Sequence, residues 1–145
     1  MTGVQTCALP IYRPQDPPGP IASRDWVRSN LKYCLTQIDA GKLWLGIAGY
    51  GYHWQTGKKR ATALPAWYCR NQATRKGVLD TYHAELGNDY LEYRENGKFN
   101  QILWESSRGM KEKLELATES RLAGVALWRL GYEEEEFWES ITEAR

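Results

Sequence analysis

A length of 145 residues allows one domain, and a formal net charge of +1 gives no electrostatic reason to expect binding to nucleic acid or to an anionic membrane surface. No apolar run is long enough to span a membrane. Most aromatic side chains carry a polar atom, because the chain has seven Trp and nine Tyr but two Phe. Such rings suit partly wet surfaces, of which a sugar face is one, although core packing must account for most of them.

The first residues look unnatural. Residues 1–11, MTGVQTCALPI, lack the basic start and the long apolar run of a secretory signal. The string resembles the translation of a sequencing-library adapter, so we expect 1–11 to be an artefactual leader and exclude it from the predicted fold. Residues 12–145 then form one unit that is cut at its amino end; a disordered natural terminus is the alternative.

The first predicted element is a helix over 26–38, which follows a proline-rich loop at 13–20. Ser23 or Asp25 can cap this helix, and its apolar residues fall on one face. The continuous apolar run LWLGIA at 43–48 then predicts a buried strand.

Residues 49–54, GYGYHW, predict a tight turn above that strand. Two glycines permit sharp backbone turns, and three aromatic rings recur at every second position. The basic residues of the following QTGKKR segment, 55–60, favour a solvated turn over a phosphate site.

A small α+β insertion is predicted over 60–103. Its elements are a helix at 63–76 and strands at 81–85, 90–94 and 99–104. The dipeptide Asn96-Gly97 is a strong hairpin signal that pairs the last two of these strands.

A second long helix is predicted after Ser106 or Ser107, with Met110, Leu114 and Ala117 facing inward. Its solvated face is expected to carry the charged residues Lys111, Glu112, Lys113 and Glu115.

The run VALW at 125–128 predicts a second core strand. Because it lies between two helical patterns, it is typical of a parallel sheet that is buried on both faces. The acidic run 133–136 is expected to be the solvated start of a last helix, whose buried side carries Phe137, Trp138 and Ile141.

The order of helix, strand, α+β insertion, helix, strand and helix predicts an α/β fold. A TIM (β/α)8 barrel needs eight strands and roughly 250 residues, so two core strands cannot close one and the length agrees with an incomplete barrel. Trp128 lies near the carboxyl end of its strand, where such barrels place the groups that contact ligands.

Four segments resemble glycoside hydrolase family 18, the chitinase-like TIM barrels, and within it the bacterial spore-germination and cell-wall branch. PGPIASRDWVRSNLKYCLTQI resembles the loop and helix after the sixth strand, and KLWLGIAGYGYHW the seventh strand with its aromatic turn. ILWESSRGMKEKLELA is similar to the return from the insertion, and GVALWRLGYEEEEFW to the eighth strand and final helix. The resemblance covers about residues 18–141 and implies that they are the C-terminal part of a TIM barrel, with its last two strands and their helices.

The resemblance implies a parent enzyme that cleaves β-1,4 links of N-acetylglucosamine polymers, in peptidoglycan or chitin, by substrate-assisted retaining catalysis. The family carries its carboxylates as D-x-x-D-x-D-x-E on the fourth strand, and this spacing does not occur here. We therefore expect no catalytic residue in this chain and no activity. Cys34 and Cys69 lack metal-ligand spacing and are expected to be buried thiols, so neither a metal nor a cofactor is predicted.

What the resemblance leaves in this chain is a sugar-binding surface. Trp128 matches the tryptophan on which the sugar of the reacting subsite stacks, and its alternative role is a core residue. Tyr50 and Tyr52 match the turn after the seventh strand and are expected to contact either the ligand or the core. Trp54 is a further candidate for contact with the ligand, and its alternative role is to cover the insertion.

Glu105 is expected to bind sugar hydroxyls or Arg129, with a structural ion pair as the favoured alternative. Three hypotheses stay open for the whole chain: part of a retaining glycosidase, a non-catalytic carbohydrate-binding relative, or an aromatic-rich protein-interaction module. The first two share a polysaccharide partner and a monomeric full-length form. A cell-wall, spore or extracellular location follows from the resemblance alone.

Overall fold

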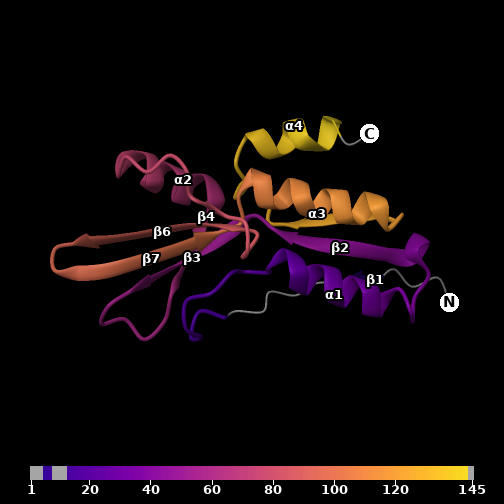
Figure 1. The fold of residues 1–145 in the computed structure, drawn as a ribbon, viewed down its shortest axis with the longest axis horizontal. Helices are drawn as coiled ribbons and strands as arrows, with labels where there is room; N and C mark the ends of the chain where they lie inside the picture. Colours follow the sequence, from indigo (N-terminus) through magenta and orange to yellow (C-terminus); the bar gives the residue numbers. More distant parts are fainter. Residues whose placement is uncertain (1–4, 8–12, 144–145) are drawn as a thin grey trace.

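The computed structural model describes residues 5–7 and 13–143, with side chains over 13–142. Its elements are β1 (Gln5–Cys7), α1 (Arg24–Cys34), a 3-10 turn (Ala40–Lys42), β2 (Leu43–Ala48), β3 (Tyr50–Gln55), β4 (Thr62–Pro65), α2 (Ala66–Arg75), β5 (Tyr82–His83), β6 (Asn88–Glu95), β7 (Lys98–Trp104), α3 (Ser107–Glu119), β8 (Gly124–Trp128) and α4 (Glu136–Glu143). Figure 1 shows two parts that meet where β2 runs into β3: a parallel sheet with α1, α3 and α4, and a second sheet with α2.

The strands β1, β2 and β8 form a parallel sheet with β2 at its centre. β2 and β8 confirm the strands predicted at 43–48 and 125–128. The prediction that the closing strand is buried on both faces is wrong, because Ala126 and Trp128 are exposed. The helices pack against the face that carries Leu45, so side chains that point the other way keep contact with water.

The strand β1 was not expected, since it lies inside the leader that we excluded. It pairs in parallel with β2, from Gln5 opposite Leu43 to Cys7 opposite Leu45. A free strand edge accepts any extended backbone, so this pairing depends little on side chains. The rest of the expected leader, 1–4 and 8–11, lies outside the described residues.

The second sheet is antiparallel, with the strand order β4-β3-β7-β6-β5. The tight turn predicted at 49–54 is wrong: β3 continues from β2 and pairs with both β4 and β7. The every-second-residue spacing of the aromatic rings is the period of a strand. Gly51 serves close packing rather than a turn, because a Cβ there would lie 2.4 Å from Trp104 Cβ.

We expect Gly51→Ala to lower the free energy of unfolding by about 1–3 kcal/mol, because the added methyl group overpacks the sheet. The Cβ would also lie 2.5 Å from the carbonyl oxygen of Leu103, so the backbone itself must move. Urea unfolding measures the loss. Gly49→Ala is the matched control, since its Cβ would meet its nearest atoms at 3.4 Å. Equal losses in the two variants would contradict this explanation.

The hairpin predicted at Asn96-Gly97 is confirmed. Both residues have positive φ, 51° and 72°, as a two-residue type I′ turn requires, and Glu95 pairs with Lys98. The helix predicted at 63–76 starts too early, because 62–65 pairs with β3 as β4. The sheet runs from Tyr50 to Trp104 and so extends beyond the range 60–103 expected for the insertion.

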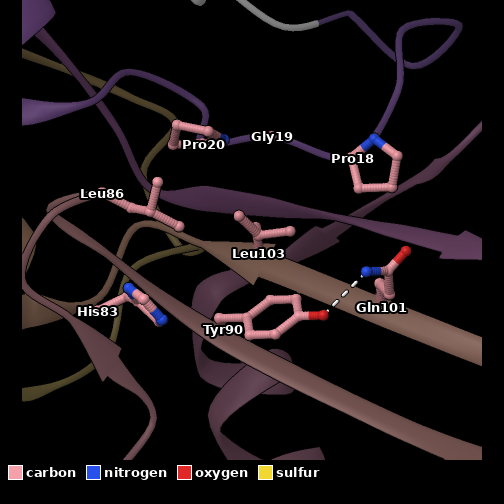
Figure 2. A pocket seen from close by; sticks show the side chains of 8 residues that line it. All are labelled: Pro18, Gly19, Pro20, His83, Leu86, Tyr90, Gln101 and Leu103. Atoms are coloured by element: carbon pink, nitrogen blue, oxygen red, sulfur yellow. Dashed lines mark hydrogen bonds between the residues drawn. The ribbon is translucent and has the colours of Figure 1, made fainter.

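The two faces of the second sheet are covered differently. One face packs on α2 through the buried residues Ala66, Cys69, Ala73, Leu91, Ile102 and Trp104. The proline-rich loop crosses the other face, where Trp54 Nε1 donates to the carbonyl oxygen of Asp16 at 2.9 Å and Ala61 N to that of Pro14 at 2.6 Å. Figure 2 shows Pro18 and Pro20 of this loop above Leu103.

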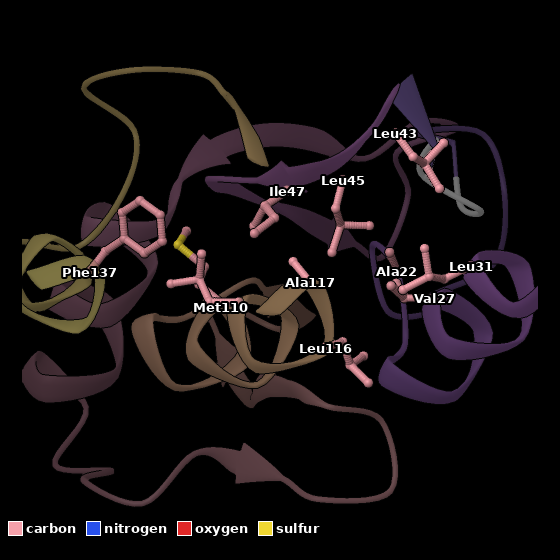
Figure 3. Packing of buried hydrophobic residues seen from close by; sticks show 11 residues of the cluster. Ala22, Val27, Leu31, Leu43, Leu45, Ile47, Met110, Leu116, Ala117 and Phe137 are labelled. Carbon is pink, nitrogen blue, oxygen red and sulfur yellow. The ribbon is translucent and has the colours of Figure 1, made fainter. Parts of the chain in front are cut away.

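The main core lies between β2 and the helices of the parallel part (Figure 3). The buried members are Ala22, Val27, Leu31, Leu43, Leu45, Ile47, Met110, Leu114, Leu116, Ala117 and Phe137. Ser23 caps α1 and Ser106 caps α3, each as one of two predicted residues. α1 ends at Cys34, earlier than the predicted 38.

The side chains of α4 are divided between the core and the surface. Trp138 was predicted on the buried side of the last helix but is 45% exposed. Phe137 and Ile141 are four residues apart and share the core face, which turns Trp138 outward.

Cys34 and Cys69 form no disulfide in the described part of the chain. None of the helices in the described ranges has the length and apolar character of a membrane span.

Candidate functional site

Trp128 ends β8 and is 70% exposed. The two parallel strands are joined at this point, because Gly49 N donates to the carbonyl oxygen of Trp128 at 2.7 Å. Ala48 is the register partner of Trp128, so both lie on the same face of the sheet. The peptide bond that follows Trp128 is cis. The carboxyl edge of the parallel sheet thus presents a flat, accessible indole.

Three aromatic side chains continue from this edge along β3. The ring centroids of Tyr50 and Tyr52 are 5.6 Å apart, and those of Tyr52 and Trp54 are 5.7 Å apart, both with edge-to-face geometry. Tyr52 is 8% exposed and packs in a small core with Ile21 and Ala61. Tyr50 and Trp54 are half-buried. The rings form one contiguous strip in which Tyr50 lies nearest to Ala48.

The hydroxyl of Tyr50 stays protonated at neutral pH. Burial raises the pKa of this phenol well above its ordinary value of 10.0, and the neighbouring Tyr52 and the charge of Glu105 raise it further. A protonated phenol is both a donor and an acceptor, which suits it to hydroxyl or amide partners.

The loop after β8 carries Arg129 and Tyr132, which bind each other. Arg129 Nη2 donates to the Tyr132 hydroxyl at 2.6 Å, and the guanidinium carbon lies 4.1 Å from the ring centroid. Arg129 is exposed at the same edge as Trp128. Among the described residues the side chain of Arg129 binds Tyr132, while Glu105 pairs with Lys113, so the contact between Arg129 and Glu105 that the sequence left open is not formed.

Glu105 forms the structural ion pair that was the alternative in the sequence. Its side chain is fully buried and its Oε2 accepts from Lys113 Nζ. Burial raises the pKa of Glu105 above its ordinary value of 4.5, while the charge of Lys113 lowers it. Lys113 was predicted on the solvated face of α3; this prediction is wrong, because the residue is 1% exposed. The lysine points inward to neutralise a buried carboxylate.

The sequence analysis missed Glu134, which lies in the acidic run expected to be solvated. Glu134 is 5% exposed. Its Oε1 accepts from Trp104 Nε1 at 3.0 Å and Arg70 Nε at 3.3 Å, and its Oε2 accepts from Ser107 N at 2.9 Å. Arg70 Nη2 also donates to Asp89 at 2.9 Å. Because four acidic residues follow each other, the sequence carries no signal that singles out this one.

Trp67 was also missed as a neighbour of the site. The first turn of α2 packs against the loop after β8: Ala66 N donates to the carbonyl oxygen of Tyr132 at 2.7 Å. Trp67 Nε1 donates to that of Gly131 at 3.2 Å, and the ring is 43% exposed. This contact joins residues 64 positions apart, which no local pattern can reveal.

Comparisons with known proteins show the family of the chain. A family model described as glycosyl hydrolases family 18 matches residues 8–133. The chain belongs to this family. The match covers both core strands and the second sheet, which confirms the resemblance seen in the sequence.

Two relatives illustrate the similarity. The uncharacterized glycosylase YvbX of Bacillus subtilis is 28% identical over 126 residues, which cover 86% of this chain and 37% of YvbX. The cortical fragment-lytic enzyme of Bacillus anthracis is 25% identical over 132 residues, which cover 88% of this chain and 31% of that enzyme. The chain therefore spans about a third of the length of these relatives.

Solved structures place the fold. The spore cortex-lytic enzyme SleL of Bacillus cereus superposes with a TM-score of 0.86 at 23% identity, over 94% of this chain and 33% of SleL. A chitinase from Chromobacterium violaceum superposes with a TM-score of 0.77 at 28% identity, over 92% of this chain and 42% of the chitinase. The predicted α/β class is confirmed, and the fold is that of chitinase-like family 18 proteins.

Proposed function

We propose that this chain is the C-terminal part of a family 18 glycosidase and carries the sugar-stacking floor of its site. β2 and β8 would be the last two strands of a TIM barrel, with the second sheet inserted between β2 and α3. The partial coverage of the relatives supports this proposal. So does the sheet face that carries Ala126 and Trp128, which is exposed as the lining of an incomplete barrel would be.

The observation that carries the proposal is the exposure of Trp128 at the carboxyl edge of the sheet. An indole covers the apolar face of a pyranose and asks for no polar partner there. In our proposal Tyr50 and Arg129 contact the sugar at the edges of the indole. Tyr52 packs against Tyr50, and Trp54 packs against Tyr52. Glu105 is enclosed and paired with Lys113, so we assign it a structural role.

The proposed substrate is a β-1,4-linked polymer of N-acetylglucosamine, in peptidoglycan or chitin. The names of the similar proteins, cortical fragment-lytic enzymes and chitinases, favour this class. The parent enzyme would use the acetamido group of the substrate as nucleophile. It would act as a monomer at the cell wall, at the spore or outside the cell.

We expect no hydrolysis by the purified 145-residue chain, because the motif that provides the general acid is absent from its sequence. The measurement is release of chromophore from a chromogenic N-acetylglucosamine glycoside, with a family 18 chitinase as positive control. Turnover above the buffer rate would contradict the assignment of the acid to a segment that this sequence lacks.

We expect Trp128→Ala to weaken binding of N-acetylglucosamine tetramer at least roughly tenfold, through lost stacking and apolar contact. Isothermal titration calorimetry measures the change. Tyr33→Ala on α1 is the matched control, since this ring is 68% exposed and lies on a helix away from the sheet edge. Unchanged affinity in the Trp128 variant would contradict the proposed floor.

A further inference from the structure

Exposed basic side chains gather at one end of the second sheet. The turn that joins β3 to β4 carries Lys58, Lys59 and Arg60, and all three are exposed. Figure 1 shows this turn at the same end of the sheet as the hairpin of β6 and β7, away from α1, α3 and α4. The sequence alone favoured a solvated turn over a phosphate site for this segment. The fold changes that balance, because it brings two more cations to the turn.

The first of these cations comes from the hairpin of β6 and β7. Thr56 N donates to the carbonyl oxygen of Phe99 at 2.9 Å, which fixes the start of the turn beside β7. The guanidinium carbon of Arg94 lies 5.4 Å from the centroid of the Phe99 ring. Arg94 is exposed, so its charge reaches solvent next to the turn.

The second cation comes from the proline-rich loop. Ala61 N donates to the carbonyl oxygen of Pro14 at 2.6 Å, and Arg60 and Arg13 are the residues that precede these two. Arg13 is exposed as well. We call the cations that these three segments bring together the cationic tip: Arg13, Lys58, Lys59, Arg60 and Arg94.

The charge of the cationic tip is not compensated by carboxylates. Within the described residues no salt bridge involves a side chain of the tip. The neighbouring acidic side chains have other partners: Asp16 accepts from a backbone N–H, Glu92 from a tyrosine hydroxyl, and Glu95 pairs with Lys76. Although the whole chain carries a net charge of +1, its positive potential is therefore concentrated here, where a bound anion would relieve the repulsion between like charges.

The cationic tip offers charge without an apolar surface. The exposed large apolar side chains of the described ranges all lie outside it: Tyr33, Trp67, Tyr68, Leu79, Trp128, Leu130 and Trp138. Binding in a membrane surface needs apolar side chains that enter the lipid, and binding of single-stranded nucleic acid needs rings on which bases stack. The tip therefore fits a polyanion that is bound through its charges alone.

The kind of anion follows from the cations. Guanidinium groups bind phosphate through paired hydrogen bonds, and lysines bind it as point charges. The oxygens of a tetrahedral phosphate point out of one plane, which suits cations that arrive from three different segments. A planar carboxylate is matched by a single guanidinium fork.

We propose that the cationic tip is a docking surface for a flexible polymer of phosphate groups, to which it tethers the protein. The tip lies at the opposite end of β3 from Tyr50, the ring that we expect to contact the sugar. The proposal is therefore independent of the proposed function.

The test is isothermal titration calorimetry of the full chain with inorganic polyphosphate at several salt concentrations. We expect the logarithm of the association constant to fall linearly with the logarithm of the salt concentration. The triple variant Lys58→Gln, Lys59→Gln, Arg60→Gln should bind at least about tenfold more weakly and make this slope shallower by about 2, since three cations no longer release counterions. Its side chains are exposed and form no salt bridge in the described residues, so folding should be kept.

The matched control removes the same charges elsewhere. The triple variant Arg28→Gln, Lys32→Gln, Lys42→Gln also loses two lysines and one arginine, at exposed positions of α1 and the 3-10 turn. Its affinity should stay within about twofold of the unsubstituted chain, because distant charges are screened by salt. Equal losses in the two triple variants would show that net charge, not the tip, attracts the polymer, and would overturn the proposal.

Three further outcomes would overturn it. The first is absence of polyphosphate binding. The second is binding of polyglutamate, at equal charge concentration, as tight as that of polyphosphate. The third is tighter binding of single-stranded DNA or of phosphatidylserine vesicles, which would replace the proposed partner. Titration of the same variants with N-acetylglucosamine tetramer reports on the sugar site separately, so a failure of the tip and a failure of the proposed function are distinguishable.

Discussion

Lys113→Met should lower the free energy of unfolding by about 3–5 kcal/mol at pH 7, because it leaves the Glu105 carboxylate buried without its counter-charge. Glu105 is fully buried and forms an ion pair with Lys113. Denaturant unfolding monitored by far-UV circular dichroism gives the loss. Lys32→Met, at an exposed position of α1, is the matched control and should change stability by no more than about 0.5 kcal/mol.

The unfolding free energy that Lys113→Met loses should depend on pH, and the loss should grow as the pH rises. Burial raises the pKa of Glu105 above 4.5 in the folded state, and removal of Lys113 takes away the charge that opposes this rise. The folded variant therefore binds a proton more tightly than the unfolded chain, so its stability falls as pH rises from 4.5 through the folded pKa. We expect a smaller deficit at pH 4.5 than at pH 7. A deficit independent of pH would contradict the buried-charge explanation.

The double variant Glu105→Met with Lys113→Met should recover most of the lost stability, since replacing both charges by apolar groups removes the desolvation cost. A double variant that is no more stable than Lys113→Met would show that the packing of the lysine stem, not its charge, is what matters.

Glu134→Ala should cost about 2–5 kcal/mol of unfolding free energy, because it leaves buried donors without acceptors. Trp104 Nε1 and Ser107 N both lose their partner, and Arg70 loses one of its two carboxylate partners and keeps Asp89. Glu135→Ala, one residue away and exposed, is the matched control. Thermal and urea unfolding compare the two variants. Similar stability in both would mean that the contacts of Glu134 contribute nothing.

The milder substitution Glu134→Gln should disturb the loop between Trp128 and α4. Glu134 ties the end of this loop to β7 through Trp104 and to the first turn of α3 through Ser107. Weaker sugar binding by Glu134→Gln, with folding retained, is the expected consequence. The carboxylate contacts no ligand in our proposal. The binding enthalpy of those Glu134→Gln molecules whose loop stays ordered should therefore equal that of the unsubstituted chain.

Local patterns predicted most of the elements. The apolar runs at 43–48 and 125–128, the Asn96-Gly97 turn and the serine caps each act within a few residues, so the sequence shows them directly. Gly51 misled the prediction because glycine serves both turns and close strand packing. Only the approach of Trp104, which is distant in the sequence, distinguishes the two uses.

The burial of two charged side chains could not be predicted from the sequence, because it too depends on contacts that are distant in the chain. Lys113 and Glu134 sit in charged runs that normally face water, and their burial depends on partners in other elements. Trp128 and Tyr50 were found as candidates through the family resemblance and the strand position. The cationic tip was missed, because it forms where a loop near the amino end and the hairpin of β6 and β7 meet the turn after β3.

In the proposed function a sugar stacks on the indole of Trp128. Intermolecular nuclear Overhauser effects between the bound N-acetylglucosamine tetramer and the chain test it most directly. We predict cross-peaks from the H1, H3 and H5 protons of one pyranose face to the ring protons of Trp128. Binding with cross-peaks to Trp67 or Trp138 and none to Trp128 would contradict it.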